Sequence, residues 1–259
     1  MAEYNGQFSA QLGGETVSKF KEGVVRVIVN KLELQDASAQ LKAQIHALNK
    51  ISAVRLIHDI EAMEEVAELI GKGSLGHHFA RNANDLSPGQ LMVIAAYNED
   101  GAPVGMVAAR RDSVPGWDLR TFLAAHWLRL YPGERLGTFA TFDENSSQYA
   151  SGLKGAFAYI GDGWISKEYR GGNLLALIQR WLLLLVYDEW KPDLIYGWMR
   201  PDKVRSGYAA RWGYSIVYPK GITWKIKPKQ TDLHDLYFVA VDQHGIRQLI
   251  LDETVECSG

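Results

Sequence analysis

Residues 174–189 constrain the fold more than any other segment, because a helix formed from them is apolar on almost every side. Gln179 and Arg180 are the main interruptions. A helix of this kind has to be covered by protein over most of its surface. Its uninterrupted apolar run is shorter than the roughly 20 residues that a membrane-spanning helix needs. We therefore expect a buried helix that lies against a sheet.

Strands and helices alternate around this segment. Residues 156–165 and 193–199 are rich in β-forming side chains. Upstream, residues 91–109 hold two β-rich runs joined by a turn that contains Asp100-Gly101, a step that suits a tight reversal. Further β-rich runs follow at 215–218, 223–226 and 236–241. The pattern predicts an α/β fold with a mixed sheet.

The remaining segments divide the chain at residue 51. We expect a tail and a helical extension over 1–51, and a main domain over 52–259 that ends in a tail at 243–259. The extension carries an apolar stripe at helical spacing, formed by Ala39, Leu41, Ile45 and Leu48. At the start of the main domain, a strand over 54–58 and an amphipathic helix over 59–70 are predicted.

Composition limits the classes of partner. The formal net charge is -2, so no overall field attracts nucleic acid or anionic lipid. One cysteine, Cys257, allows neither an intrachain disulfide nor a thiolate metal cage. The first residues lack the basic and apolar regions of a signal peptide. These features predict a cytoplasmic protein that binds neither membrane nor nucleic acid.

The turn before the long helix has the chemistry of a phosphate site. It reads Tyr169-Arg170-Gly171-Gly172-Asn173. Glycine has no Cβ, so backbone N–H groups can face outward. The first turn of the helix adds unpaired N–H groups and a positive dipole end, and Arg170 adds a permanent charge. Such a turn suits a phosphate or pyrophosphate, although a Gly-Gly step also serves as a plain strand-to-helix connection.

This turn resembles the signature of the GNAT acyltransferase superfamily, in which a strand leads into Arg/Gln-x-x-Gly-x-Gly/Ala at the start of a long helix. The stretch Ile165-Ser166-Lys167-Glu168-Tyr169-Arg170-Gly171 is similar to the family's strand end. A second likeness follows in the strand at 193–199 and in a short helix predicted over 204–212. That helix ends in a Trp212-Gly213-Tyr214 step. The resemblance covers roughly residues 52–242 and is sharpest over 156–215.

The resemblance implies a splayed mixed β-sheet, flanked by helices, with acyl-CoA between its two central strands. The pantetheine would pair with backbone around Trp164, Ile165 and Ser166. The pyrophosphate would rest beside Arg170 on the amides of Gly171, Gly172, Asn173 and Leu174. Acetyl-CoA or another acyl-CoA would donate its acyl group to a primary amine of a small molecule or peptide, by direct attack on the thioester and without a metal.

Direct attack requires a base for the amine proton and an acid for the leaving thiolate. The family often places a carboxylate where Asp162 lies, although Gly161-Asp162-Gly163 is also typical of a bulge or a turn. The family's acidic tyrosine falls on Ala209. Tyr208 is the candidate acid only if its helix starts or turns differently, because one residue rotates a helix by about 100°.

Departures from the family pattern leave three functions open. The middle glycine of the turn falls on Asn173 and its last small residue on Leu175. An acyl-CoA-dependent N-acyltransferase is the leading interpretation. A GNAT-shaped binding module without turnover is the second, and an acyltransferase fed by acyl carrier protein is the third.

An aromatic-rich insertion at 112–155 separates two strands that family members often join briefly. It contains a predicted helix over 118–130. We expect it to wall the acceptor or acyl pocket, to bury itself against the N-terminal helices, or to form a homodimer contact. The pair His77-His78 is predicted to be solvated in a loop, and His126 to have a packing role.

Overall fold

The computed structural model describes residues 29–48, 50–130, 140–229 and 231–255. Several sequence-based expectations lie partly or wholly outside these ranges: the first part of the tail and helical extension predicted over 1–51, the middle of the 112–155 insertion, the end of the tail predicted at 243–259, and Cys257.

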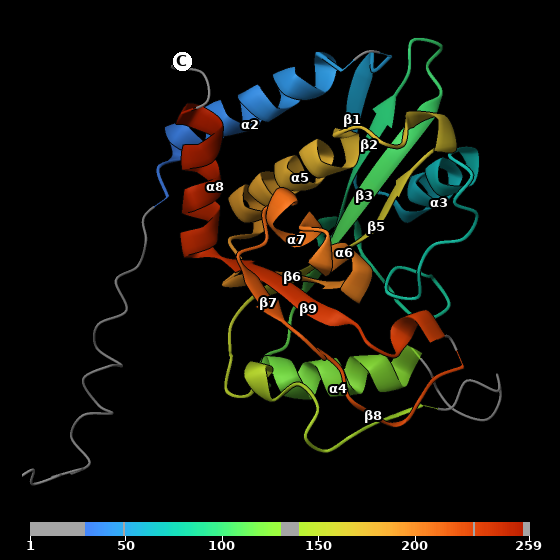
Figure 1. The fold of residues 1–259 in the computed structure, drawn as a ribbon, viewed down its shortest axis with the longest axis vertical. Coiled ribbons are helices and arrows are strands. Elements are labelled where there is room, and N and C mark those ends of the chain that lie inside the picture. Colours follow the sequence, from blue (N-terminus) through green and yellow to red (C-terminus); the bar gives the residue numbers. More distant parts are fainter. Residues whose placement is uncertain (1–28, 49, 131–139, 230, 256–259) are drawn as a thin grey trace, which may run out of the picture.

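A seven-stranded sheet forms the centre of the molecule (Figure 1). In spatial order its strands are β1 (Ala53–Ile57), β2 (Leu91–Tyr97), β3 (Pro103–Asp112), β5 (Phe157–Ile165), β6 (Leu194–Met199), β9 (Tyr237–Asp242) and β7 (Ile216–Tyr218). The β5–β6 pair is parallel, and the other neighbouring pairs are antiparallel. The predicted α/β class with a mixed sheet is confirmed.

Helices cover both faces of the sheet (Figure 1). Alternate residues of β2 show the two sides: Ile94 packs in one buried cluster and Val93 in the other. The first cluster includes side chains of α2 (Lys31–His46), α5 (Leu174–Trp190) and α8 (Gln243–Val255). The second includes side chains of α3 (Ile60–Leu69) and α4 (Leu119–Leu130). The strict alternation of β2 therefore builds two cores from one strand.

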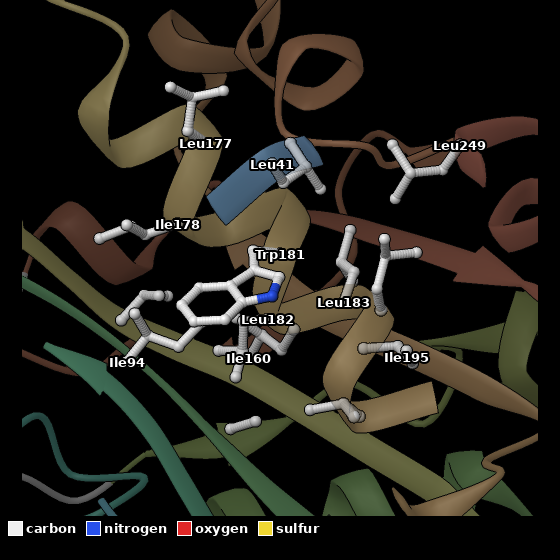
Figure 2. Packing of buried hydrophobic residues seen from close by; sticks show 14 of the residues in the cluster. Leu41, Ile94, Ile160, Leu177, Ile178, Trp181, Leu182, Leu183, Ile195 and Leu249 are labelled. Atoms are coloured by element: carbon white, nitrogen blue, oxygen red, sulfur yellow. The ribbon is translucent and has the colours of Figure 1, made fainter. Parts of the chain in front are cut away.

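Helix α5 is buried as its composition predicts. Leu182, Leu183 and Leu184 have no exposed surface. The Trp181 indole N–H donates to Ser38 Oγ at 2.7 Å, which ties α5 to α2. Figure 2 shows Leu182 of α5 beside Ile160 of β5 in this core, with Ile94 of β2 and Ile195 of β6 on either side. The helix lies on the sheet and is covered by α2 and α8.

The tail predicted at 243–259 is wrong for residues 243–255, which form α8. Ile246, Leu249 and Ile250 follow a spacing of three and four residues and are buried. Glu253 continues the same face and forms an ion pair with Arg180 of α5. The apolar stripe of this helix is short and polar residues lie between its members, so the sequence pattern alone does not predict the helix.

The helix predicted over 204–212 is two helices, α6 (Pro201–Arg205) and α7 (Tyr208–Arg211). Gly207 separates them with φ 76°, a left-handed conformation that glycine adopts without steric cost. Tyr208 is consequently the first residue of a new helix. The run at 223–226 also differs, because β8 (Trp224–Ile226) pairs with β4 (Thr141–Phe142) in a separate small sheet.

Within the described ranges, no helix is both long enough and apolar enough to cross a membrane.

Candidate functional site

The two parallel strands of the sheet separate along their length. They pair only where Phe157–Tyr159 faces Leu194–Tyr196. Beyond Tyr159, β5 stays paired with β3 as far as Ile165, and β6 stays paired with β9 as far as Met199. The backbone of residues 160–165 therefore has no ladder partner on the side of β6, and the opening between the strands widens toward the start of α5.

A β-bulge lies at the point where the strands separate. Met106 faces Trp164 and Ala108 faces Gly161, so three steps along β5 oppose two steps along β3. The additional residue is accommodated around Asp162, whose φ is 54°. The bulge interpretation of the Gly-Asp-Gly pattern is thus confirmed. A bulge of this kind redirects a side chain and is common next to active sites.

Asp162 is held by the loop that follows α3. Its Oδ2 and Oδ1 accept from the Gly76 N–H at 2.9 and 3.2 Å, and Lys72 Nζ lies 3.5 Å from Oδ2. The Asp162 side chain is 10% exposed. Burial raises the pKa of its carboxyl above the usual value, and the Lys72 ammonium partly offsets that rise. A buried carboxyl with a raised pKa is suited to accept a proton.

Asp162 faces a cavity of about 350 Å³ between β5 and β6, which we call the V cleft. The V cleft is lined by Lys72, Tyr159, Ile160, Gly161, Asp162, Gly163, Gln179, Trp198, Met199, Arg200, Lys203, Trp212, Tyr214 and Val239. Tyr214 closes its inner part: its hydroxyl accepts from Gln179 Nε2 at 3.1 Å, and burial raises its pKa. A Cβ at Gly197 would lie 3.0 Å from that hydroxyl and 2.9 Å from the Ile160 carbonyl, so this end of the cleft is tight.

A second cavity of about 350 Å³, the turn groove, lies over the Gly-Gly turn. Its lining is Gly163, Trp164, Ile165, Tyr169, Arg170, Gly171, Gly172, Leu175, Lys203 and Tyr208. Gly163 and Lys203 line both cavities, which places the two spaces next to each other. The groove and the cleft together follow the unpaired edge of β5.

The Gly-Gly turn leaves room for a ligand. Gly171 has φ 90°, which a residue with a side chain rarely adopts. A Cβ at Gly171 or Gly172 would meet no atom within 4 Å. Leu174 begins α5, whose first-turn amides lack helical partners. The turn thus combines open space beside two glycines with the start of a helix, and an anion site uses both.

Arg170 borders this turn in a fixed position. Its Nε donates to the Ile165 carbonyl at 2.9 Å, and its guanidinium carbon lies 4.8 Å from the centre of the Trp164 ring. Stacking and a hydrogen bond to the same strand hold the charge at the groove wall. Ser166 lies at the strand end, where its N–H donates to the Val104 carbonyl.

Asn173 has a role that sequence reasoning missed. It occupies the N-cap of α5 without a side-chain capping bond. Its Oδ1 instead accepts from Arg211 at 2.8 Å. Asn173 therefore holds a second arginine beside the turn. The contact joins residues 38 apart in sequence, and no local pattern predicts it.

Tyr208 lines the turn groove, whereas Ala209 is buried in the core. The break at Gly207 produces this orientation. Lys203 Nζ lies 5.0 Å and the Arg211 guanidinium carbon 5.4 Å from the centre of the Tyr208 ring. Two cations thus flank the phenol at the groove. The structure brings Tyr208 and Asp162 to adjacent cavities that share Gly163.

The prediction of a solvated histidine pair is wrong for His78, which packs beneath the V cleft. Its ring lies 4.5 Å from that of Tyr159, and its Nδ1 is 3.0 Å from His126 Nε2. Arg129 is 2.9 Å from His126 Nδ1. Because a guanidinium only donates, His126 must donate through Nε2, and His78 accepts at Nδ1. Burial lowers the pKa of both imidazoles, and the nearby positive charge of Arg110 lowers it further. Both rings are therefore neutral.

The 112–155 insertion packs its aromatic side chains against the sheet. Trp127 of α4 is 1% exposed and makes edge contacts with Trp198 and Trp224. Trp198 also lines the V cleft. In its described part, the insertion therefore supports the wall of the cleft from behind, while His126 contacts the loop that carries His78.

Across the ranges that the structure describes, no group of three or more His, Cys, Asp or Glu side chains is placed to hold a metal ion.

Comparisons with known proteins find likeness in structure and none in sequence. No protein-family model matches the chain, and no curated protein matches it in sequence. Among solved structures, it is similar to Arabidopsis thaliana NAA60 in complex with acetyl-CoA (TM-score 0.43, 12% identity, 73% of this chain and 98% of that chain). It is also similar to FeeM, an N-acyl amino acid synthase from uncultured soil microbes (TM-score 0.45, 10% identity, 78% and 97%).

A third similar structure is the aminoglycoside acetyltransferase AAC(6')-Ib in complex with coenzyme A and kanamycin (TM-score 0.40, 12% identity, 76% and 98%). These neighbours are GNAT transferases, the superfamily that the motifs at 165–173 resemble.

Proposed function

We propose that this protein is an acyl-CoA-dependent N-acyltransferase of the GNAT type that acylates a primary amine. The observation that carries the proposal is the continuity of three features. The unpaired edge of β5 at 160–165 leads directly into an open Gly-Gly turn, and that turn begins the buried helix α5. The acyltransferase unit spans 52–259, with α2 as a packed extension.

The unpaired strand edge suits the amide groups of a pantetheine arm. Backbone around Trp164, Ile165 and Ser166 would pair with those amides, since β5 has no neighbour on the side of β6 there. The pyrophosphate would accept from the amides of Gly171, Gly172, Asn173 and Leu174, with Arg170 and Arg211 supplying positive charge. The thioester would then lie where the turn groove meets the V cleft, at Gly163.

The acceptor amine enters the V cleft, where Asp162 supplies the base. The neutral amine attacks the thioester carbonyl, a C–N bond forms and the C–S bond breaks. The amine proton passes to the Asp162 carboxylate, and the Tyr208 hydroxyl protonates the leaving thiolate. A raised pKa at Asp162 strengthens it as a base, which supports this assignment.

One observation favours a second candidate, a GNAT-shaped binding module without turnover. The family's acidic position is occupied by Ala209, which is buried. In that case the turn groove binds acyl-CoA, and thioester is not consumed with any amine.

Replacement of Tyr208 by Phe separates the two candidates. In the enzyme, loss of the acid lowers the rate of thioester consumption with a reactive amine by about 10²-fold. This rate is measured by quenching the reaction at set times and quantifying the free CoA thiol released with each of a panel of primary amines. Tyr218→Phe is the matched control, because Tyr218 is exposed on the edge strand β7 and should leave the rate unchanged. Equal rates for Tyr208→Phe and wild type would remove Tyr208 from the reaction.

A further inference from the structure

We propose that Lys72 is an internal acceptor of the acyl group, so that the enzyme acylates its own ε-amine in the V cleft. The inference rests on the proposed function, because it requires an acyl thioester at the junction of the turn groove and the cleft. It assigns a modification site to the loop that follows α3.

The chain after α3 is folded so that the Lys72 side chain turns back to the sheet. Lys72 lies between Gly71 and Gly73, with φ 72° and 82°. A Cβ added at either glycine would meet no atom within 4 Å. The positive φ, and not a lack of space, therefore favours glycine at both positions. The N–H groups of Lys72 and Gly73 both donate to the Ala67 carbonyl, at 3.0 and 3.2 Å. This turn places Lys72 in the lining of the V cleft.

The Lys72 amine lies beside the proposed base. Nζ is 3.5 Å from Asp162 Oδ2 and donates to the Ser74 carbonyl at 2.7 Å, while the side chain is only 12% exposed. The Gly76 N–H donates to the same carboxylate oxygen at 2.9 Å. A primary amine within reach of a buried carboxyl is the arrangement that an acceptor has to adopt in this cleft.

A matched pair elsewhere in the chain shows what is special about Lys72. Lys191 also contacts a carboxylate, with Nζ 2.9 Å from Asp188 Oδ1. Its side chain is 60% exposed, at the opposite end of α5 from the Gly-Gly turn. The two lysines therefore share a carboxylate partner and differ in exposure and in access to the donor.

The acyl transfer to Lys72 requires no reagent other than the acyl thioester. Lys72 gives one proton to Asp162, and the neutral amine attacks the thioester carbonyl. A C–N bond forms, the C–S bond breaks, and the leaving thiolate takes a proton from the Tyr208 hydroxyl. The second amine proton leaves to solvent as the amide forms.

The test exposes the full-length protein to acetyl-CoA and, separately, to acetic anhydride, and maps acetylated lysines by peptide mass spectrometry over time. With acetyl-CoA, Lys72 should be acetylated before Lys191. With acetic anhydride, which reacts with accessible amines, the order should reverse. Asp162→Asn should slow acetylation of Lys72 from acetyl-CoA by about 10²-fold and leave Lys191 unchanged. Lys72→Arg keeps the positive charge and should abolish the early modification.

The outcomes separate this inference from the proposed function. Acetyl-CoA binding, measured by calorimetry, together with a Lys72 that is modified no faster than Lys191 would overturn the inference alone. Failure to bind any acyl-CoA would overturn the proposed function and the inference together. Thermal unfolding of Asp162→Asn and Lys72→Arg checks that each variant folds, and the wild-type order of modification stands as evidence without either variant.

Discussion

Two buried aspartates lie on the same sheet and have very different surroundings. Asp112 on β3 accepts from Arg110 Nε at 2.8 Å and from the Tyr196 hydroxyl at 2.7 Å, with all three side chains buried. Asp162 on β5 accepts from one backbone N–H, lies 3.5 Å from an ammonium, and borders a cavity. The first carboxylate is fully paired and closed off, whereas the second retains capacity to bind and faces open space. A buried carboxylate whose partners are all protein groups stabilises the fold, whereas one that borders a cavity can take part in a reaction.

Removal of the closed carboxylate should have the largest effect on stability. Asp112→Ala leaves Arg110 buried without its partner, and breaking a buried ion pair costs about 3–5 kcal/mol. Urea unfolding measures the change in free energy of unfolding. A loss below about 1 kcal/mol would mean that the Arg110–Asp112 pair is not what stabilises this side of the sheet.

Removal of the open carboxylate should act on rate more than on stability. Asp162→Asn retains the shape of the side chain but cannot accept the amine proton, so the rate of transfer should fall by about 10²- to 10⁴-fold. Thioester consumption at saturating acyl-CoA reports this rate. Normal turnover together with strongly reduced stability in this variant would show that Asp162, like Asp112, stabilises the fold and is not the base.

The histidines beside the closed pair predict a smaller, pH-dependent effect. The pKa of His78 and of His126 is lowered by burial, so the unfolded chain binds more protons than the folded one below about pH 6.5. Stability should be complete above that pH and should fall as pH drops, by up to about 1.4 kcal/mol per pH unit for each histidine. Urea midpoints at several pH values test this, with His126→Gln as the comparison.

The variant isolates the histidine contribution, since Asp162 titrates in both proteins. His126→Gln should remove about half of the fall in stability between pH 6.5 and 5.5. An identical slope in both proteins would show that His126 does not contribute to the acid sensitivity.

The parts of the molecule that follow from local sequence could be predicted. Helix α5 follows from its continuous apolar run, and the hairpin of β2 and β3 from alternation and a turn. The turn between β5 and α5 follows from its two adjacent glycines, and Gly171 has the positive φ that favours glycine. Each of these elements depends on residues within one short segment, where propensity and burial point to the same conformation.

The parts that depend on distant contacts could not be predicted. His78 meets His126 across 48 residues, and Asn173 meets Arg211 across 38. The orientation of Tyr208 depended on one backbone choice, the left-handed Gly207, which the sequence leaves open. Asp162 could be assigned to a bulge only when the register with β3 was known. Contacts and registers of this kind are decided by tertiary packing.

Titration calorimetry with acetyl-CoA and longer acyl-CoAs tests the central claim most directly. The account predicts saturable one-site binding with a dissociation constant in roughly the micromolar range, as is common for enzyme substrates. Gly172→Ala should weaken it, because the added methyl lies in the turn groove and meets no atom of the fold. Absence of binding by every acyl-CoA at high micromolar protein, or undiminished binding by Gly172→Ala, would contradict the assignment of this turn as the donor site.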